Sequence, residues 1–297
     1  MMSETLRHVI ASIGPASAAH AEGARLKLAG LNAPMLERLG ARLAAAQHTA
    51  RIRARRMIAV AICDHATGDP GIALGPAHPT AIAARAIADG SAALAHIART
   101  AHAPIVLVDA GAREPIDAVA LGRVTTRDLL VEPALTVVDA AMALDAGIAL
   151  ALSLETDIVA VGALGLGSEV STAALRGALL RETITGPEAE ANALGLAWDG
   201  SPLETLARFG GGDTCVLAGL MLAAASMNVP TLLDGPATGA AALIAAAFAP
   251  EVRGYLIAAH AGSGWPGPIF DVGLGNGEGT GAAMALSLVD QCASMTA

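Results

Sequence analysis

The chain has 297 residues, of which 54% are hydrophobic and only 2% aromatic, and it carries a net charge of −9. Because it has no basic stripe and almost no rings to stack on bases, we expect no nucleic-acid partner. No apolar run reaches about 18 uninterrupted residues, so we expect no membrane span. Three widely separated cysteines and the absence of a signal-peptide pattern suit a reducing cytoplasm.

The first 50 residues predict helices, and from residue 57 onward short apolar runs alternate with Ala-rich helical patterns. The expected strands cover residues 57–63, 104–108, 157–161, 229–233, 255–259 and 269–272. The expected helices cover residues 80–100, 136–154, 169–183, 213–227, 238–248 and 281 to about 295. Residues 182–202 show the least pattern and are expected to form a surface connection. The alternation predicts an α/β fold with a parallel, doubly wound, Rossmann-like sheet of about six strands.

Polar residues and glycines follow every expected strand. In chain order they are Asp64 with His65, Asp109, the loop 162–169, Asp234, His260, and Asp271 with Glu278. Ligands of open parallel sheets bind outside the carboxyl ends of the strands, so we expect a small-molecule site at this edge. Turn chemistry alone explains Asp and Gly at any single strand end. Their recurrence after six strands favours a site.

The segment "GALGLGSEVSTAALRGALL" has the order strand end, Gly-rich loop, helix. Backbone N–H groups at such a helix start are able to hold a phosphate, here around Gly165, Gly167 and Ser168. The segment lacks the Gly-Lys-Ser/Thr of a P-loop and the spacing of a dinucleotide fingerprint. A phosphate cradle and a plain tight turn therefore both remain open.

Three further residues have a structural and a functional interpretation. Asp213, after three glycines in "RFGGGDTCVLAGL", is more typical of a helix N-cap than of a ligand contact. His65 and His260 are more typical of hydrogen-bonded structural groups than of general bases. The histidines show no paired ligand spacing, so we expect no metal site.

Glu278 lies in "DVGLGNGEGTGAAMAL", between Gly275, Gly277, Gly279 and Gly281, with a helical run behind it. One interpretation is an acidic cap at a helix start, where the dipole favours its charge. The other is a catalytic base in a tight pocket. Apolar walls would raise the pKa of Glu278, whereas a helix start and backbone donors would lower it.

Seven segments follow one another in a familiar order from about Ala24 to the end of the chain. They are "AICDHATG", "TAIAARAIADGSAALAHIA", "VLVDAGA", "GRVTTRDLLVEPALT", "GGGDTCVLAGLMLAAA", "VPTLLDGPATGAAAL" and "DVGLGNGEGTGAAMAL". Together they resemble the nicotinate-nucleotide–dimethylbenzimidazole phosphoribosyltransferase family. The last is similar to the family's Leu-Gly-Glu-Gly-Ser/Thr-Gly-Ala segment, whose Glu is the catalytic base. In this chain, that Glu is Glu278.

The resemblance implies transfer of phosphoribose from nicotinate mononucleotide to a benzimidazole-like base, which gives an α-ribotide for the lower ligand of cobamides. It implies that Glu278 takes the azole proton, with no metal and no cofactor. It also implies a cytoplasmic homodimer with an α/β domain at 51–280 and a small helical domain, made of residues 1–50 and the C-terminal helix 281–297. The residues expected to contact substrates are Asp64, His65, Thr80, Ile82, Asp109, Gly165, Gly167, Ser168, Asp213, Asp234, His260, Gly277 and Gly279.

The chain departs from the family pattern where the nucleotide phosphate and the base would be held. Ala163 replaces a Glu, Ile82 replaces the base-contacting Gln, and the family's Gly-Arg-Gly-Thr-Gly stretch and following Lys have no counterpart. Losing a charged hydrogen-bond partner typically costs about 1.5–3 kcal/mol per group. Three arginines are candidates to compensate: Arg127, Arg176 and Arg181.

Three hypotheses follow. The first is a phosphoribosyltransferase, acting on an apolar base that suits Ile82; the retained Asp64, Asp234 and Glu278 favour it. The second is a non-catalytic paralogue that binds a small ligand or serves as partner subunit of a catalytic homologue, which Ala163 favours. The third is an unrelated sheet-edge enzyme using His65 or His260.

Overall fold

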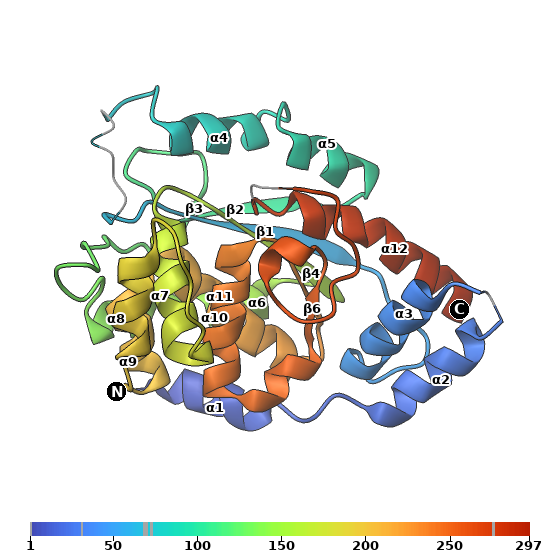
Figure 1. The fold of residues 1–297 in the computed structure, drawn as a ribbon. Coiled ribbons are helices and arrows are strands. Elements are labelled where there is room, and N and C mark those ends of the chain that lie inside the picture. The colour runs from blue at the N-terminus through green and yellow to red at the C-terminus, as the bar shows by residue number, and fades with distance from the viewer. Residues whose placement is uncertain (1, 31, 68–70, 72–73, 275–276) are drawn as a thin grey trace.

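The computed structural model describes residues 2–30, 32–67, 71, 74–274 and 277–297. Its centre is a parallel sheet in the order β3-β2-β1-β4-β5-β6 (Figure 1). The strands are β1 (Arg56–Cys63), β2 (Ile105–Gly111), β3 (Val119–Ala120), β4 (Ile158–Leu164), β5 (Thr231–Leu233) and β6 (Leu256–Ala258). The prediction of a parallel, doubly wound α/β sheet is confirmed. Strand order reverses between β1 and β4, and such a switch point opens a crevice at the carboxyl ends of the strands.

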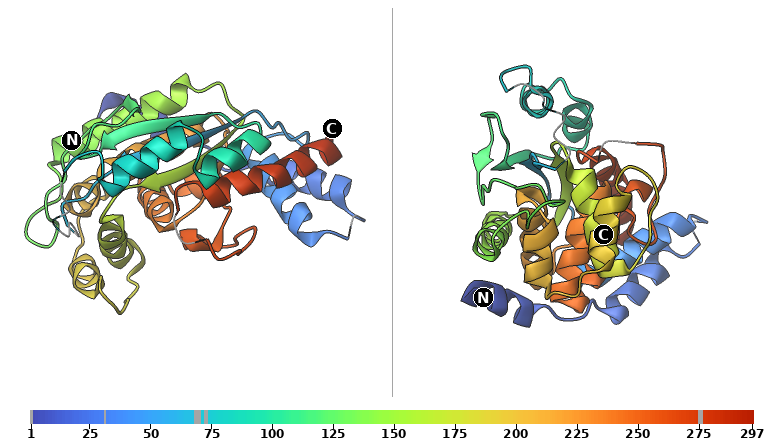
Figure 2. Two further views of the ribbon diagram at one scale, coloured as in Figure 1. Left: turned by 90° about the horizontal axis from the view of Figure 1, so that it is seen from above. Right: turned by 60° about the vertical axis from the view of Figure 1, so that its left-hand side comes forward.

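Helices cover both faces of the sheet, so its strands are apolar on both sides (Figures 1 and 2). In β1, Ile58 and Val60 contribute to the core on one face, and Ala59 and Ala61 to the core on the other. The first face carries α3 (Pro34–Ala46), α4 (Pro79–Ala88), α5 (Ala93–Thr100) and α12 (Thr280–Thr296). The second carries α6 (Val137–Ser153), α7 (Ser168–Leu180), α9 (Pro202–Phe209), α10 (Gly212–Ser226) and α11 (Pro236–Phe248).

Small residues let the helices of the second face pack closely. A Cβ on Gly147 of α6 would overlap the carbonyl oxygen of Val216 on α10, and one on Gly219 would overlap the carbonyl oxygen of Leu144. Almost every residue of α10 is buried. The high hydrophobic content is thus used inside the domain, and no helix in the described part of the chain is long and apolar enough to cross a bilayer.

The N-terminal helices pack in two different places. Helix α1 (Glu4–Ser12) packs against α6 and α10 on the second face. Helix α2 (Ala18–Leu28) and α3 pack against each other and against α12, so the first and last helices of this group lie side by side (Figure 1).

Several predicted elements were wrong. Residues 269–272 do not form a strand, because only an isolated bridge joins His260 and Phe270. The sixth strand of the sheet is instead β3, which the sequence did not predict. Its two residues are exposed and too few to form a recognisable apolar run. Residues 80–100 form two helices rather than one, since Gly90 adopts a positive φ between α4 and α5.

The stretch 182–202 is more than a surface connection. It contains α8 (Ala189–Leu196), whose Gly195 lies so close to α7 that a Cβ would overlap the carbonyl oxygen of Ala174. The sequence reasoning also missed α9, although Ser201 and Glu204 form a capping box at its start. That spacing, Ser-x-x-Glu before an apolar run, was a usable signal.

Candidate active site

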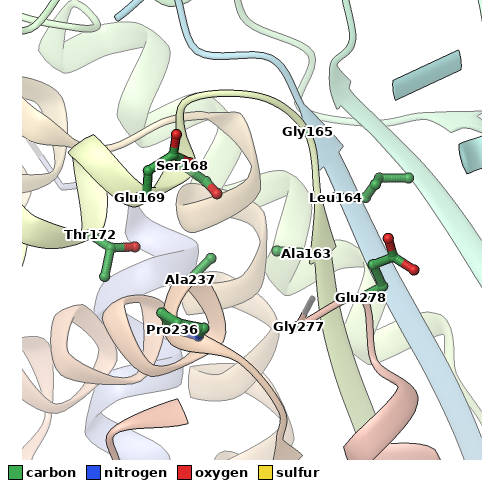
Figure 3. Close-up of a pocket in the computed structure, with 10 residues that line it drawn as sticks. All are labelled: Ala163, Leu164, Gly165, Ser168, Glu169, Thr172, Pro236, Ala237, Gly277 and Glu278. Carbon is green, nitrogen blue, oxygen red and sulfur yellow. The ribbon is translucent and has the colours of Figure 1, made fainter. Parts of the chain in front are cut away.

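Glu278 lines a cavity of about 400 Å³ at the carboxyl end of β4, beside the switch point of the sheet. The cavity is bounded by the end of β4, the first turns of α7 and α11, and the segment that leads into α12 (Figure 3). Its lining residues are Ala163, Leu164, Gly165, Ser168, Glu169, Thr172, Pro236, Ala237, Gly277 and Glu278. This is the strand-end edge at which the sequence predicts a small-molecule site.

The segment after β4 brings a helix start to the cavity, as its sequence predicts. Gly167, at φ 76°, is the N-cap of α7 and supplies no side-chain acceptor to the first turn. Gly165 lies so close to the end of β1 that a Cβ would overlap the carbonyl oxygen of Cys63. Helix α11 also begins at a glycine without a side-chain cap, Gly235. The first turns of both helices therefore offer backbone N–H groups near the cavity.

Glu278 is not the cap of α12. The N-cap is Gly279, at φ 104°, and its N–H donates to Asp234 Oδ2 at 2.7 Å. Asp234, at the end of β5, is buried beside the helix start, and a Cβ on Gly281 would overlap its Oδ1. No described residue donates a hydrogen bond to the Glu278 carboxylate. The N–H at the start of α12 is therefore bound by Asp234, which follows β5, and the Glu278 carboxylate is left available to a ligand.

The surroundings of Glu278 make it a stronger base than an exposed glutamate. Burial raises the pKa of Glu278, and the nearby charge of Asp234 raises it further. Burial also raises the pKa of Asp234, although the N–H of Gly279 and the imidazole of His260 favour its charged form. The charge of Asp234 is thus the second cause, after burial, of the raised pKa of Glu278. A raised pKa suits a general base that works near neutral pH.

The Asp234→Asn variant tests this coupling. Asparagine still accepts the Gly279 N–H but carries no charge, so the pKa of Glu278 should fall toward its ordinary value. A base with a lower pKa stays ionised to lower pH, so the acid limb of kcat/KM should shift to lower pH. Because a weaker base takes a proton more slowly, the plateau value of kcat/KM at higher pH should fall by a few-fold. The measurement is a pH profile of both proteins; an acid limb at the same pH in both would contradict the coupling.

Glu278 is held against β4 by close backbone packing. A Cβ on Gly162 would overlap the carbonyl group of Glu278. The next residue, Ala163, donates its N–H to the Gly277 carbonyl oxygen at 3.1 Å. A glycine in β4 therefore makes the room in which the Glu278 backbone lies. Of the four glycines around Glu278, Gly275 lies outside the described residues.

Asp64 ties the ends of several strands together rather than pointing into the cavity. Its Oδ1 accepts from the Thr80 hydroxyl of α4 and from the Leu166 N–H at 3.1 Å, in the loop after β4. Its Oδ2 accepts from the Arg113 N–H at 2.9 Å, after β2. Asp64 and Thr80 are both buried. They set the position of the loop that leads to Ser168.

His65 and Asp213 form a buried pair, with Nε2 and Oδ1 3.1 Å apart. Burial lowers the pKa of His65, but the charge and hydrogen bond of Asp213 outweigh it, so the net shift is upward. The N-cap prediction for Asp213 was wrong, because α10 begins at Gly212 with Gly211 as its cap. The Cys63 sulfur lies close to this pair: one possible metal-ligand atom from each of Cys63, His65 and Asp213 lies within 4.8 Å of the other two. Burial strongly raises the pKa of the Cys63 thiol, which favours its protonated form.

Of the thirteen expected contact residues, only Gly165, Ser168 and Gly277 line the cavity. Three of the others, Asp109, His260 and Ile82, lie elsewhere. Asp109 accepts the N–H groups of Gly111 and Ala112 at 3.1 and 2.9 Å, which closes the turn after β2. His260 accepts the Gly262 N–H at 3.0 Å, in the structural manner favoured by the sequence. The side chain of Ile82 is 50% exposed on α4. The structure brings together Gly165, Ser168, Gly277 and Glu278, but not these three.

A sequence profile of the family described as "Phosphoribosyltransferase" matches residues 13–297. The chain belongs to the phosphoribosyltransferase family. Two nicotinate-nucleotide–dimethylbenzimidazole phosphoribosyltransferases illustrate the similarity. The one from Roseiflexus sp. (strain RS-1) is 34% identical, over 97% of this chain and 92% of its own length. The one from Desulforudis audaxviator (strain MP104C) is 31% identical, over 99% and 95%.

The fold comparison agrees with the sequence comparison. The crystal structure of nicotinate-nucleotide–dimethylbenzimidazole phosphoribosyltransferase from Thermus thermophilus superposes with a TM-score of 0.82 at 28% identity. The match covers 94% of this chain and 96% of that one. The family predicted from the sequence segments is therefore confirmed, as is the transferase class that this family implies.

Within this phosphoribosyltransferase, none of the three candidate arginines lines the cavity. Arg176 of α7 forms an ion pair with Glu182, and Arg127 Nε lies 3.6 Å from Glu132 Oε2. Arg181 donates a hydrogen bond to the Leu196 carbonyl oxygen at 2.8 Å. None of the ten lining residues carries a positive charge.

The sequence analysis missed Thr172 and the Pro236–Ala237 turn as lining residues, and it included Glu169 only as the end of the Gly-rich loop 162–169. The order strand, "DG", proline, helix at residues 231–248 was a signal for the last of these.

Proposed function

We propose that this phosphoribosyltransferase transfers the phosphoribosyl group of nicotinate mononucleotide to a benzimidazole-like base and so makes the α-ribotide of a cobamide lower ligand. The similar enzymes from Roseiflexus and Desulforudis are named for these substrates, which supports the assignment. The observation that carries the proposal is Glu278, a half-buried carboxylate with a raised pKa and no described hydrogen-bond donor, at a cavity on the strand-end edge. We propose Glu278 as the catalytic base.

The reaction needs one proton acceptor. One ring nitrogen of the azole attacks C1′ of the ribose and forms the new C1′–N bond. The old C1′–N bond breaks, and nicotinate leaves with its electron pair. The azole N–H proton then passes to the Glu278 carboxylate, which prevents a positive charge from remaining on the product ring. Ser168 and Thr172 add hydroxyl groups to the helix-start N–H groups around the sugar phosphate.

A second candidate is a non-catalytic paralogue that binds a small ligand or assists a catalytic homologue. One observation favours it: the cavity lining has no cationic side chain that would hold a phosphate. The retained base and its capped helix favour the enzyme instead, since neither is needed for a passive binding role.

Incubation of purified protein with nicotinate mononucleotide and dimethylbenzimidazole tests the first candidate. We expect equal amounts of free nicotinate and α-ribotide, separated by chromatography. A panel of other benzimidazoles and phenols then ranks the acceptor. If no acceptor yields product while the protein still binds the mononucleotide, the paralogue explains the chain better.

We propose a cytoplasmic homodimer, with α2, α3 and α12 as a small helical domain. Their mutual packing supports the domain division. Helix α1, which the sequence analysis also assigned to this domain, packs against α6 and α10 of the α/β domain instead. An apolar row on the outer side of α6 supports self-association, because Val138, Met142 and Leu152 are each more than half exposed. A single-chain mass in sedimentation analysis would contradict the dimer.

A further inference from the structure

The charges around the cavity are unusual for a site that receives a phosphate. Among the ten lining residues the ionisable ones are two carboxylates, Glu169 and Glu278, and none is cationic. They lie on opposite sides of the cavity, with Glu169 on α7 and Glu278 beside β4 (Figure 3). Only one carboxylate is needed to accept the azole proton. Glu169 is therefore a charged residue that the proposed mechanism does not use.

Glu169 occupies the part of the cavity that otherwise suits an anion. It belongs to the first turn of α7, directly after Ser168, where the uncapped backbone N–H groups and the helix dipole attract negative charge. A carboxylate in that turn already interacts with the dipole and repels a second anion from it. The nearest cation along the helix, Arg176, is paired with Glu182. A phosphate here thus meets like charge without a cationic counterpart among the lining residues.

We propose that Glu169 is a specificity-determining residue that disfavours a phosphate dianion, so that this chain also accepts a ribosyl donor without phosphate, nicotinate riboside. This inference rests on the proposed function of the same cavity. The same bonds form and break with nicotinate riboside as with nicotinate mononucleotide. The azole nitrogen forms the C1′–N bond, nicotinate leaves with the electron pair of the old bond, and Glu278 receives the azole proton. The product is the α-riboside instead of the α-ribotide.

The test compares kcat/KM for nicotinate mononucleotide and nicotinate riboside in the wild type and in Glu169→Gln. In the wild type the two donors should differ by no more than a few-fold. Glutamine keeps the size of the side chain but removes its charge, so the variant should prefer the mononucleotide by about tenfold more than the wild type does. A change of that size corresponds to about 1.4 kcal/mol.

Glu190→Gln is the matched control. Glu190 is an exposed acidic residue in the first turn of another helix, α8, and does not line the cavity. It changes the net charge of the protein by the same amount, so its donor ratio should remain that of the wild type. An equal change in both variants would show a general charge effect and overturn the inference. So would an unchanged donor ratio in Glu169→Gln, or a shift of that ratio toward the riboside.

Binding measurements separate this inference from the proposed reaction. If neither donor gives product, calorimetric titration of each protein with nicotinate mononucleotide still decides the role of Glu169. About tenfold tighter binding to Glu169→Gln than to the wild type would uphold the inference while the proposed reaction fails. Equal or undetectable binding to the two proteins would overturn it.

Discussion

Replacing Glu278 by glutamine is expected to lower kcat for α-ribotide formation by about 10²–10⁴-fold, the range typical of a lost general base. Glutamine has the same size and still fits beside Gly162, but its amide cannot take the azole proton. The helix start should be unaffected, since Asp234 rather than Glu278 accepts the Gly279 N–H. Chromatographic assays of nicotinate and α-ribotide, with nicotinate mononucleotide saturating, measure the change.

The pH dependence of the wild type gives an independent check on Glu278. Its pKa is raised by burial and then by Asp234, and only the ionised form accepts a proton. Activity should therefore be present above this raised pKa and be lost as the pH falls through it. That loss should occur at higher pH than for an ordinary glutamate, and the acid limb should be absent from residual Glu278→Gln activity. Unchanged turnover in the variant would reject Glu278 as the base.

Gly162→Ala is expected to reduce activity by about 10²-fold, because its methyl group must displace the Glu278 backbone. A misplacement of about 1 Å at a reacting group is sufficient for such a loss. The overpacked strand should also lower the free energy of unfolding by about 1–3 kcal/mol. Steady-state assays below the melting transition, together with thermal unfolding, separate the loss of activity from the loss of stability.

Gly14→Ala is the control for this substitution. An added Cβ at Gly14 meets no heavy atom within 4 Å, and its backbone is not in the left-handed region. It should retain wild-type activity. The proposed packing role of Gly162 fails if Gly162→Ala is as active as Gly14→Ala.

Local pattern was a good guide wherever an element is long and apolar. The run 57–63 corresponds to β1, and the pattern 136–154 corresponds to α6, each within about a residue at both ends. Local pattern did not indicate β3, since two exposed residues have no periodicity. It also failed for 269–272, where an apolar run meets a neighbour at a single bridge instead of a ladder. Strand formation there depends on a partner that local sequence does not specify.

The candidate site shows the same division between local and distant information. The Gly-rich loop before α7 and the glycines near Glu278 are local features, and the sequence identified both. The interpretation of Glu278 needed the rest of the fold. Asp234, which accepts the Gly279 N–H at the start of α12, is 45 residues from Gly279 in the chain. Asp213 was misread for the same reason, because its partner His65 is 148 residues away.

By itself, the sequence determined the order of strands and helices, the parallel sheet, the family and the candidate base. These depend on periodicity and on short motifs, which are properties of neighbouring residues. Only the tertiary structure decided that Glu278 is free of the helix cap, that Gly162 makes room for it, and that Glu169 faces the same cavity without a cation. These depend on which strand ends are brought together at the switch point between β1 and β4, and hydrogen bonding, burial and charge act across that space irrespective of separation along the chain.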